Sequence, residues 1–254
     1  MATYVLVHGG NISTTTWNRF TVRDPIHTAD GLLGGKCWDG TAADLAADGH
    51  RAFAPTLSDE HHSTLTDHIG QVVSLIREQD LQDVILVGHS YGGMVITGVA
   101  AKIPDRIRRL VYIDAALPDP GQSLFDIILA GGADPLSFAG LEPAPPYVEK
   151  LQFDPGRIAA IPKTYILCTK SGFASVTQVA QEKIAADGRG WTYIELPASH
   201  VPMEDMPGAL YRVMREAGGK KTEEPNQGKQ EHPGFPQKYM SGLISLTAKS
   251  LPVN

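Results

Sequence analysis

Cysteine is scarce in this chain, since its 254 residues include only Cys37 and Cys168 and no Cys-x-x-Cys pair. A disulfide framework is therefore not indicated, and a reducing cytoplasm is the simplest expected compartment. The segment Met1 to His8 enters an apolar run without a basic region, so we expect no signal peptide. Long apolar runs are also missing, because no stretch approaches the roughly 20 residues that span a bilayer. We expect a soluble protein that does not enter membranes.

Clusters of basic charge are absent as well. The formal net charge is -6, and Lys and Arg form no long run. Nothing in the sequence therefore suggests a surface that tracks phosphates, and neither nucleic acid nor an anionic membrane is an expected partner. The run Asp59-Glu60-His61-His62 contains metal-ligand types, but adjacent residues on one short loop rarely converge on one ion. We favour a solvated loop there and expect no metal.

Short apolar runs alternate with amphipathic stretches of helical length. Strands are predicted at Tyr4–Val7, Ala52–Ala54, Val84–Val87, Leu110–Ile113, Thr164–Cys168 and Thr192–Leu196. Helices are predicted at Ala42–Asp48, Asp67–Glu78, Met94–Lys102, Val176–Ala186 and Ala209–Ala217, the first with Thr41 as N-cap and Gly49 as stop. This alternation indicates an α/β fold with a mostly parallel sheet covered on both faces.

Three stretches interrupt the alternation. Residues 11–36 form a long irregular excursion after the first strand, and 117–162 are rich in Pro and Gly yet too apolar for a solvated loop. We predict a core over 1–116 and 163–217, with 117–162 as a small cap. Residues 218–254 are predicted to be a polar linker followed by an apolar docking segment. We expect that segment to dock on a partner subunit, which gives a homodimer, whereas a frayed terminus is the alternative.

The strongest motif is Gly88-His89-Ser90-Tyr91-Gly92, which follows the apolar run Val84–Val87 and precedes a predicted helix. A serine on such a sharp strand-to-helix turn is exposed above the sheet, and only small neighbours fit around it. The helix N-terminus that follows favours developing negative charge. Ser90 is therefore the predicted nucleophile.

A serine hydroxyl needs a base that takes its proton. Among nine histidines, only His200 follows a late strand, downstream of the serine, as the chain order Ser, acid, His requires. The acid must hold the imidazole in its productive tautomer. Asp114 ends one eligible strand, whereas the strand Thr164–Cys168 is followed by no carboxylate. We predict that Asp114 is this acid. The alternative is that Asp114 only caps the start of the segment 117–162, and that Glu182, Asp187 or no carboxylate orients His200.

The oxyanion hole is predicted from two backbone N–H groups, those of Gly10 after the first strand and Tyr91 after the nucleophile. Substrate contacts are predicted for residues around the same loops and for two aromatic residues, namely Gly9, Asn11, Trp38, Phe125 and Val201. Packing in the core and the cap explains the aromatic residues equally well.

Several segments together resemble a known family: VLVHGG, CWDG, ADLAADGHRAFAPTL, DVILVGHSYGGMVITGVA and RLVYIDAALPDPGQS. They are similar to the small α/β-hydrolases that include plant methylesterases, hydroxynitrile lyases and bacterial esterase relatives. The resemblance covers 3–125 well and 163–217 more loosely. It implies an α/β-hydrolase fold with a six-stranded, mostly parallel sheet, a small cap after the strand ending at Asp114, and no cofactor.

The chain departs from the family pattern in three places. Members usually carry the acid after the strand matching Thr164–Cys168, where this chain has Lys170-Ser171-Gly172. The 11–36 insertion lengthens the path from the HG motif to the CW motif, and the tail after Gly218 has no recognised counterpart. The resemblance implies His-Thr at the first loop of the lyases and His-Lys at their catalytic histidine. This chain has His8-Gly9 and His200-Val201 at these positions, which disfavours lyase chemistry.

The sequence therefore predicts a serine esterase or lactonase that acts on a small, largely apolar substrate. Two alternatives remain open. The same site could carry out other chemistry, such as lyase elimination, C–C cleavage or cyclisation, or the pocket could serve a receptor that only binds.

Overall fold

The computed structural model describes residues 1–10, 12–18, 24–138, 141–188 and 190–218. These residues belong to one compact unit, Met1–Gly219. The linker and docking segment predicted over 218–254, and the homodimer inferred from it, fall outside the described residues apart from Gly218.

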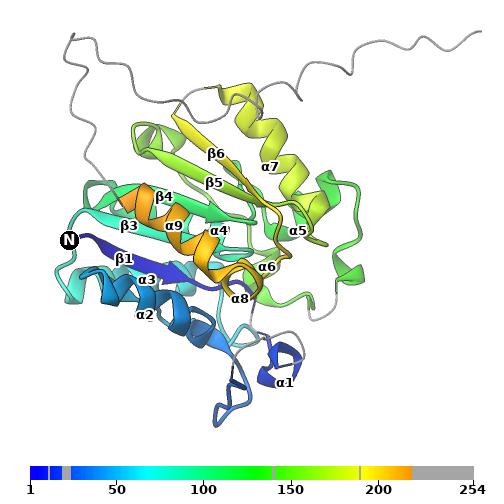
Figure 1. The fold of residues 1–254 in the computed structure, drawn as a ribbon. Helices are drawn as coiled ribbons and strands as arrows, with labels where there is room; N and C mark the ends of the chain where they lie inside the picture. Colours follow the sequence, from blue (N-terminus) through cyan, green and yellow to red (C-terminus); the bar gives the residue numbers. More distant parts are fainter. Residues whose placement is uncertain (11, 19–23, 139–140, 189, 219–254) are drawn as a thin grey trace, which may run out of the picture. The chain divides into compact units, whose positions relative to one another are not determined.

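Six parallel strands form one sheet with the order β2-β1-β3-β4-β5-β6 (Figure 1). They are β1 (Thr3–Val7), β2 (Arg51–Phe53), β3 (Val84–His89), β4 (Ile107–Ile113), β5 (Lys163–Cys168) and β6 (Trp191–Leu196). Every residue of β3 and β5 is buried, as a continuous apolar run in a sheet covered on both faces predicts. The predicted α/β fold with a six-stranded sheet is confirmed.

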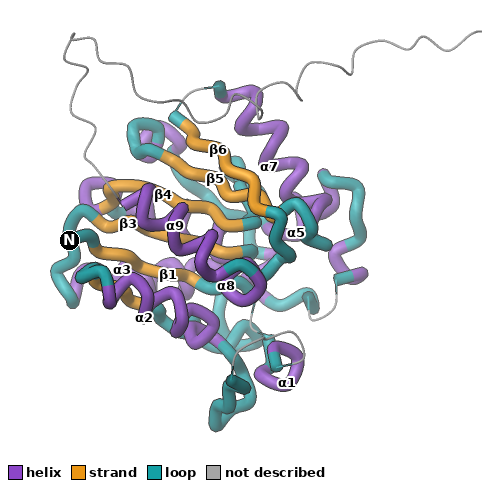
Figure 2. The backbone as a smooth tube through the Cα atoms, in the orientation of Figure 1, coloured by secondary structure: helices purple, strands orange, loops and turns teal. Residues whose placement is uncertain are grey.

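Helices cover both faces of the sheet (Figures 1 and 2). The α-helices are α1 (Thr14–Trp17), α2 (Asp39–Ala47), α3 (Leu65–Glu78), α4 (Gly92–Lys102), α5 (Leu124–Ala130), α6 (Pro145–Val148), α7 (Ala174–Asp187), α8 (Pro202–Asp205) and α9 (Pro207–Gly218). Short 3₁₀ helices lie at η1 (Gly34–Trp38), η2 (Pro104–Arg106), η3 (Pro135–Ser137) and η4 (Pro155–Ile158). Helices α3, α4, α5 and α7 share one buried cluster with the sheet, whereas α2 and α9 belong to a second cluster.

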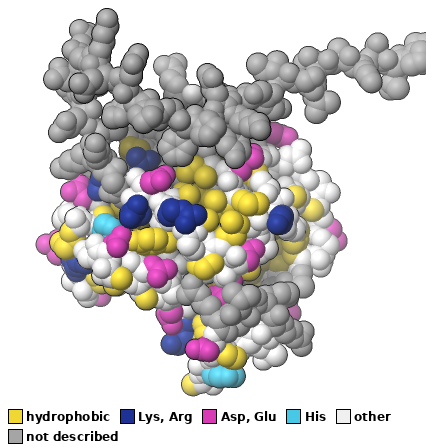
Figure 3. All heavy atoms as spheres, in the orientation of Figure 1, with side chains coloured by type: hydrophobic (Ala, Val, Ile, Leu, Met, Phe, Trp, Pro, Cys, Tyr) yellow, Lys and Arg dark blue, Asp and Glu magenta, His cyan; other side chains and the backbone are white. Residues whose placement is uncertain are grey.

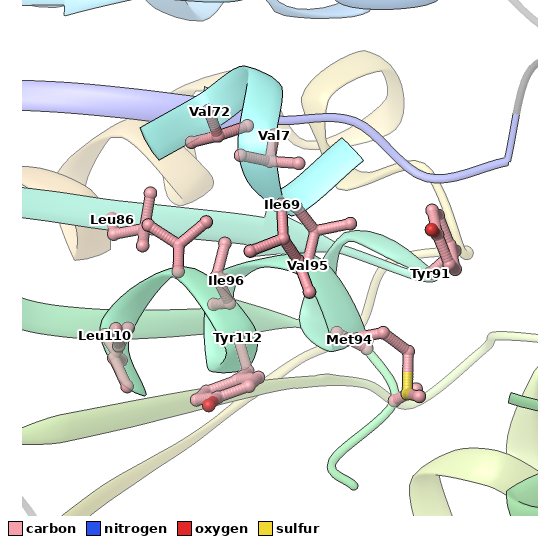
Figure 4. Close-up of a cluster of buried hydrophobic side chains, with 14 of the residues drawn as sticks. Val7, Ile69, Val72, Leu86, Tyr91, Met94, Val95, Ile96, Leu110 and Tyr112 are labelled. Atoms are coloured by element: carbon pink, nitrogen blue, oxygen red, sulfur yellow. The ribbon is translucent and has the colours of Figure 1, made fainter. Parts of the chain in front are cut away.

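The first cluster fixes the helix that follows the predicted nucleophile. Ile69 and Val72 of α3 pack with Val95 and Ile96 of α4 and with Leu86 of β3 (Figure 4). Fully burying such a side chain stabilises a fold by about 1.5–3 kcal/mol. Helix α4, whose described residues from Gly92 to Ala101 are all buried, is therefore held rigidly behind Ser90.

The predicted N-cap of one helix is wrong. Helix α2 begins at Asp39 rather than after Thr41, because η1 leads directly into it and Trp38 occupies the N-cap position without a side-chain cap. Thr41 lies inside the helix and is buried. The chain is already helical when it reaches Thr41, so no N-terminus remains there to cap.

The segment 117–162, predicted as a cap, contains α5, η3, α6 and η4 among its described residues. It is packed rather than solvated, since Leu124, Ile128 and Tyr147 are each at most 1% exposed. Gln122 and Leu151 form an antiparallel bridge that closes the segment on itself.

The surface over α2 and α9 carries Lys and Arg side chains that alternate with acidic and apolar ones (Figure 3). Within the described ranges, no helix has the length and apolar character needed to cross a membrane.

Candidate active site

Ser90 lies on the turn between β3 and α4, and its backbone is in the left-handed region with a φ of 55°. The turn is closed by hydrogen bonds from the N–H groups of Gly93 and Ala116 to the Ser90 carbonyl. A Cβ on Gly88 would lie 2.6 Å from the Gly92 carbonyl oxygen, and one on Gly92 would lie 2.8 Å from the carbonyl oxygens of Val7 and His8. The two motif glycines are therefore required by close backbone approach.

His200 lies between β6 and α8 and reaches Ser90 across the sheet edge. Its Nε2 is 3.0 Å from Ser90 Oγ, and its Nδ1 is 2.6 Å from Asp114 Oδ2. Because a carboxylate only accepts, Nδ1 carries the proton and Nε2 faces the serine hydroxyl as an acceptor. The three residues form a continuous line of hydrogen bonds.

Asp114 follows β4 directly and is fully buried. Its backbone is also left-handed, with a φ of 45°, and its Oδ1 accepts from the Cys168 N–H at 3.1 Å. The alternative carboxylates are bound elsewhere, since Glu182 accepts from Gln178 and Asp187 accepts from the Trp191 indole. Among the predicted candidates, the structure brings only Asp114 to His200.

The N–H groups of Gly10 and Tyr91 donate no hydrogen bond to any residue that the structure describes. A Cβ on Gly9 would lie 3.3 Å from Ser90 Oγ, so the loop after β1 passes directly beside Ser90. His8 orients this loop: its Nε2 accepts from the Leu57 N–H, and its Nδ1–H therefore donates to the Gly9 carbonyl at 2.8 Å. The Gly10 N–H belongs to the same planar peptide and points away from that carbonyl, free to bind an anion.

Two buried histidines beside the site are held neutral. Burial lowers the pKa of His8 to about 4, against the opposing effect of its bond to the Gly9 carbonyl. Burial, reinforced by the neighbouring His200, lowers the pKa of His89 to about 3. His89 Nε2–H donates to the His200 carbonyl at 2.6 Å, and the two rings lie 4.6 Å apart. A neutral His89 thus supports the backbone of His200 without placing a positive charge beside its ring.

Tyr91 is held in place by contacts with His68 of α3 and with Tyr147 of the segment 117–162. The His68 ring donates from Nε2 to the Ser58 carbonyl and accepts from the Tyr91 hydroxyl at Nδ1, 3.0 Å away. Tyr147 of α6 packs edge-on against Tyr91 and donates to Glu60. A Cβ on Gly10 would lie 2.9 Å from the Tyr147 hydroxyl, so this side of the loop after β1 is filled.

A cavity of about 100 Å³ opens on the other side of Ser90. Of the predicted substrate contacts, Gly9 and Val201 line it, and Asn11 lies outside the described residues. Trp38 and Phe125 do not line it: Trp38 is fully buried edge-on to His89, and Phe125 packs against the cluster on the opposite face.

Sequence reasoning did not assign most of the cavity wall. Four of the unassigned lining residues are Ile12, Leu33, Cys37 and Met203. The irregular stretch 11–36 was the available signal, because a long insertion that directly follows the loop after β1 is well placed to shape a binding site beside Ser90. Its packing against α8 depends on contacts that are distant in the chain, and no local pattern reports them.

The run Asp59-Glu60-His61-His62 lies on an exposed loop, where His62 Nδ1 contacts Asp59. Within the part of the chain that the structure describes, no group of three or more His, Cys, Asp or Glu side chains could hold a metal ion.

Comparison with known families gives one family match. Residues 4–150 match the model of the alpha/beta hydrolase family.

Comparison with curated proteins finds several esterases. A carbendazim hydrolyzing esterase from Nocardioides sp. is 44% identical over 137 residues, which cover 50% of this chain and 48% of that protein. Polyneuridine aldehyde esterase from Rauvolfia serpentina is 32% identical over 122 residues, covering 48% of this chain and 41% of that protein. The chain thus spans about half the length of the curated relatives it matches.

Solved structures show the same fold over a longer range. An extracellular alpha/beta-hydrolase from a Paenibacillus species superposes with a TM-score of 0.65 at 24% identity, covering 87% of this chain and 100% of that one. The crystal structure of polyneuridine aldehyde esterase gives a TM-score of 0.64 at 18% identity, covering 86% and 100%. At these identities the similarity establishes the fold alone.

Proposed function

Because the chain belongs to the alpha/beta hydrolase family, we propose that it is a serine esterase that cleaves a carboxylic ester or lactone through an acyl-enzyme on Ser90. The observation that carries this proposal is the hydrogen-bonded line from Ser90 Oγ through His200 to the buried Asp114 carboxylate. The names of the relatives, which include a carbendazim hydrolyzing esterase and polyneuridine aldehyde esterase, support ester hydrolysis as the reaction class.

In the first half-reaction, Ser90 Oγ attacks the ester carbonyl carbon while His200 Nε2 takes the hydroxyl proton. Asp114 keeps the proton on Nδ1 and stabilises the imidazolium that forms. The N–H groups of Gly10 and Tyr91 bind the developing oxyanion. When the intermediate collapses, the C–O bond to the alcohol breaks and His200 returns the proton to the departing oxygen.

In the second half-reaction, water attacks the acyl carbon of the ester to Ser90. His200 Nε2 takes a proton from this water, the bond to Ser90 Oγ breaks, and the serine regains its proton from the imidazolium. The carboxylic acid then leaves.

The size and lining of the cavity support a small apolar group next to the reacting carbonyl. Its volume of about 100 Å³ lies well below the range of roughly 300–1,000 Å³ that is usual for drug-sized ligands. Leu33, Met203 and Val201 supply an apolar wall. We propose that only a short chain of the ester enters it, while the rest of the substrate stays outside.

A fluorophosphonate probe tests the proposal, because it reacts with an activated serine and needs no knowledge of the substrate. We expect the wild-type chain to gain one adduct on the peptide that contains Ser90. Ser90→Ala should remain unlabelled and keep less than about a thousandth of the wild-type rate on chromogenic esters, with an unchanged unfolding temperature.

Ser171→Ala is the matched control, since it removes another hydroxyl near His200 and should be labelled like the wild type. An unlabelled wild-type chain would instead indicate a receptor that only binds.

The cytoplasmic location and the homodimer remain sequence-based proposals. The free, buried thiols of Cys37 and Cys168 are compatible with a reducing compartment. The proposed docking segment lies outside the described residues, and truncation after Gly219 tests it. The arm hypothesis predicts that the truncated chain loses the dimer, measured by solution mass.

A further inference from the structure

A groove of about 770 Å³ lies on the face of the sheet that α3 and α4 cover. Residues of α3, of α4 and of the stretch between 149 and 157 line it, and all of them are described. The groove and the cavity beside Ser90 have no described lining residue in common. Its volume lies within the range of roughly 300–1,000 Å³ that is usual for small-molecule sites. The groove is therefore large enough for a ligand and separate from the candidate active site.

The floor of the groove is apolar, and a glycine keeps its middle open. Ile69, Val73 and Leu151 line the groove and are each at most 7% exposed. Gly70 lies inside α3, where glycine is less favourable than alanine. A Cβ on Gly70 would nevertheless meet nothing within 4 Å beyond its neighbours in the helix. Packing does not require this glycine, whereas a ligand that passes close to the helix backbone would.

The two ends of the groove differ in their charges. At one end, Thr66 donates to the Glu149 carboxylate from both its N–H and its hydroxyl, so this acid is bonded within the protein. Arg77 lies about three turns further along the same helix, at the other end of the groove. An anion is therefore repelled at the first end and attracted at the second.

Lys102 of α4 lies toward the same end as Arg77. Helices α3 and α4 each join two neighbouring parallel strands, so they run in the same direction. Ile69 of α3 contacts Gly98 of α4, and Lys102 follows Gly98 by about one turn. Neither Arg77 nor Lys102 forms an ion pair with a carboxylate that the structure describes. Each is in the last turn of its helix, whose partial negative charge offsets only part of the side-chain charge.

We propose that this groove binds an alkyl carboxylate of about ten carbons, with its carboxylate at Arg77 and Lys102 and its chain along α3, over Gly70. From Thr66 to Arg77 the helix rises about 16 Å, at about 1.5 Å per residue, which accommodates an extended chain of about ten carbons with its carboxylate. The apolar floor receives the chain, and the cationic end receives the head group on a chain whose formal net charge is -6. This site does not depend on the proposed esterase activity.

Isothermal titration calorimetry of the full chain with decanoate, below the concentration at which decanoate aggregates, measures the affinity. We expect saturable binding of one decanoate per chain. Octanoate should bind about fourfold more weakly, because two methylenes are lost from a groove that is open on one side. 1-Octanol should bind at least about tenfold more weakly than octanoate, because it lacks the charge. A merely apolar surface would instead favour the alcohol.

Three variants test the placement of the ligand. Gly70→Leu fills the groove and should weaken decanoate binding at least about tenfold, while the unfolding temperature stays equal or rises because leucine is the better helix former. Arg77→Gln and Lys102→Gln should each weaken decanoate binding about fivefold. Arg212→Gln is the matched control, since it removes an exposed cation of α9 outside the groove and should leave the affinity unchanged.

The inference is overturned if decanoate does not bind, if 1-octanol binds as tightly as octanoate, or if Gly70→Leu retains the wild-type affinity. It is also overturned if Arg77→Gln and Lys102→Gln weaken binding no more than Arg212→Gln does. Ser90→Ala should bind decanoate like the wild type, and a loss of binding in this variant would place the ligand at the candidate active site and overturn the inference. None of these results depends on whether the chain cleaves esters.

Discussion

The carboxyl ends of β4 and β5 lie side by side in the sheet but contribute differently to the site. The end of β4 supplies Asp114, whose Oδ2 is 2.6 Å from His200 Nδ1. The end of β5 supplies Ser171, whose Oγ is 3.5 Å from the same nitrogen, at the outer limit of a hydrogen bond. Two neighbouring strand ends thus face one imidazole, and only one of them carries a charge.

The two distances show that a side chain from either strand end can reach the same imidazole. Adjacent parallel strands end at the same edge of a sheet, so residues that follow either strand can reach the same point. Asp114 reaches His200 from a left-handed backbone position, which Asp tolerates better than most residues. The N–H of Cys168, the last residue of β5, then holds the carboxylate in place.

The largest expected effect comes from removing the charge at the end of β4. Asp114→Asn should lower kcat by roughly 10³–10⁴-fold, because the amide no longer holds the productive tautomer of His200. Ser171→Ala, at the end of β5, should change kcat by less than about threefold. Steady-state kinetics on one ester compare the two variants, and equal losses would mean that both strand ends orient the base.

The free energy of unfolding should also depend strongly on pH, because His8 and His89 are buried at strand ends. Both pKa values are lowered in the folded chain, to about 4 and about 3, while the unfolded chain keeps a histidine pKa near 6.5. The unfolded state therefore binds more protons, and stability is lost as pH falls from about 6.5 toward 4. For His8 the shift corresponds to about 3 kcal/mol at about 1.4 kcal/mol per pKa unit.

Urea unfolding between pH 7 and pH 4.5 measures this loss. His8→Gln should make the dependence shallower, because the amide does not titrate. A free energy of unfolding that stays constant over this range would show that the two histidines are not held neutral.

A third prediction moves the charge from one strand end to the other. Asp114→Asn combined with Ser171→Asp should recover about 10–100-fold of the activity lost in Asp114→Asn alone. Ser171 Oγ accepts from the Phe173 N–H, a role that an aspartate can keep. Kinetics of the double variant against Asp114→Asn alone measure the recovery. No recovery would mean that the end of β5 is misplaced for orienting His200.

A smaller effect, on the free energy of unfolding, distinguishes the structural role of Asp114 from the role of its charge. Asp114→Asn should leave the free energy of unfolding nearly unchanged, because the amide oxygen still accepts from Cys168 and Asn tolerates a positive φ. Asp114→Leu should destabilise the fold by about 1–3 kcal/mol, since it leaves the Cys168 N–H unpaired in the core. Denaturant unfolding compares the two variants, and equal stabilities would contradict a buried hydrogen bond at this position.

The sequence was most informative where local pattern decides the structure. Short apolar runs located all six strands, and the glycines around Ser90 located the elbow, because both signals come from neighbouring residues. Helix α2 was misjudged at Thr41 because η1, which no pattern predicted, carries the helical turn forward from Gly34.

Long-range packing decided what sequence could not predict. Trp38 and Phe125 were expected at the substrate, yet each packs into a core cluster, since an aromatic residue near a motif can point to either side of the sheet. Trp17, Leu33 and Met203 meet beside Ser90 although they come from opposite ends of the chain. No local periodicity carries that information.

The proton on His200 Nδ1 offers the most direct test of the proposal that Asp114 orients the base. In ¹H NMR spectra of ¹⁵N-histidine-labelled protein, a short hydrogen bond to a buried carboxylate shifts this proton far downfield of the amide region. The resonance, identified by its absence in His200→Gln, should be present in the wild type and in Ser171→Ala and should be lost or move upfield in Asp114→Asn. A resonance that persists unchanged in Asp114→Asn, or that disappears in Ser171→Ala, would contradict the assignment of the acid to the end of β4.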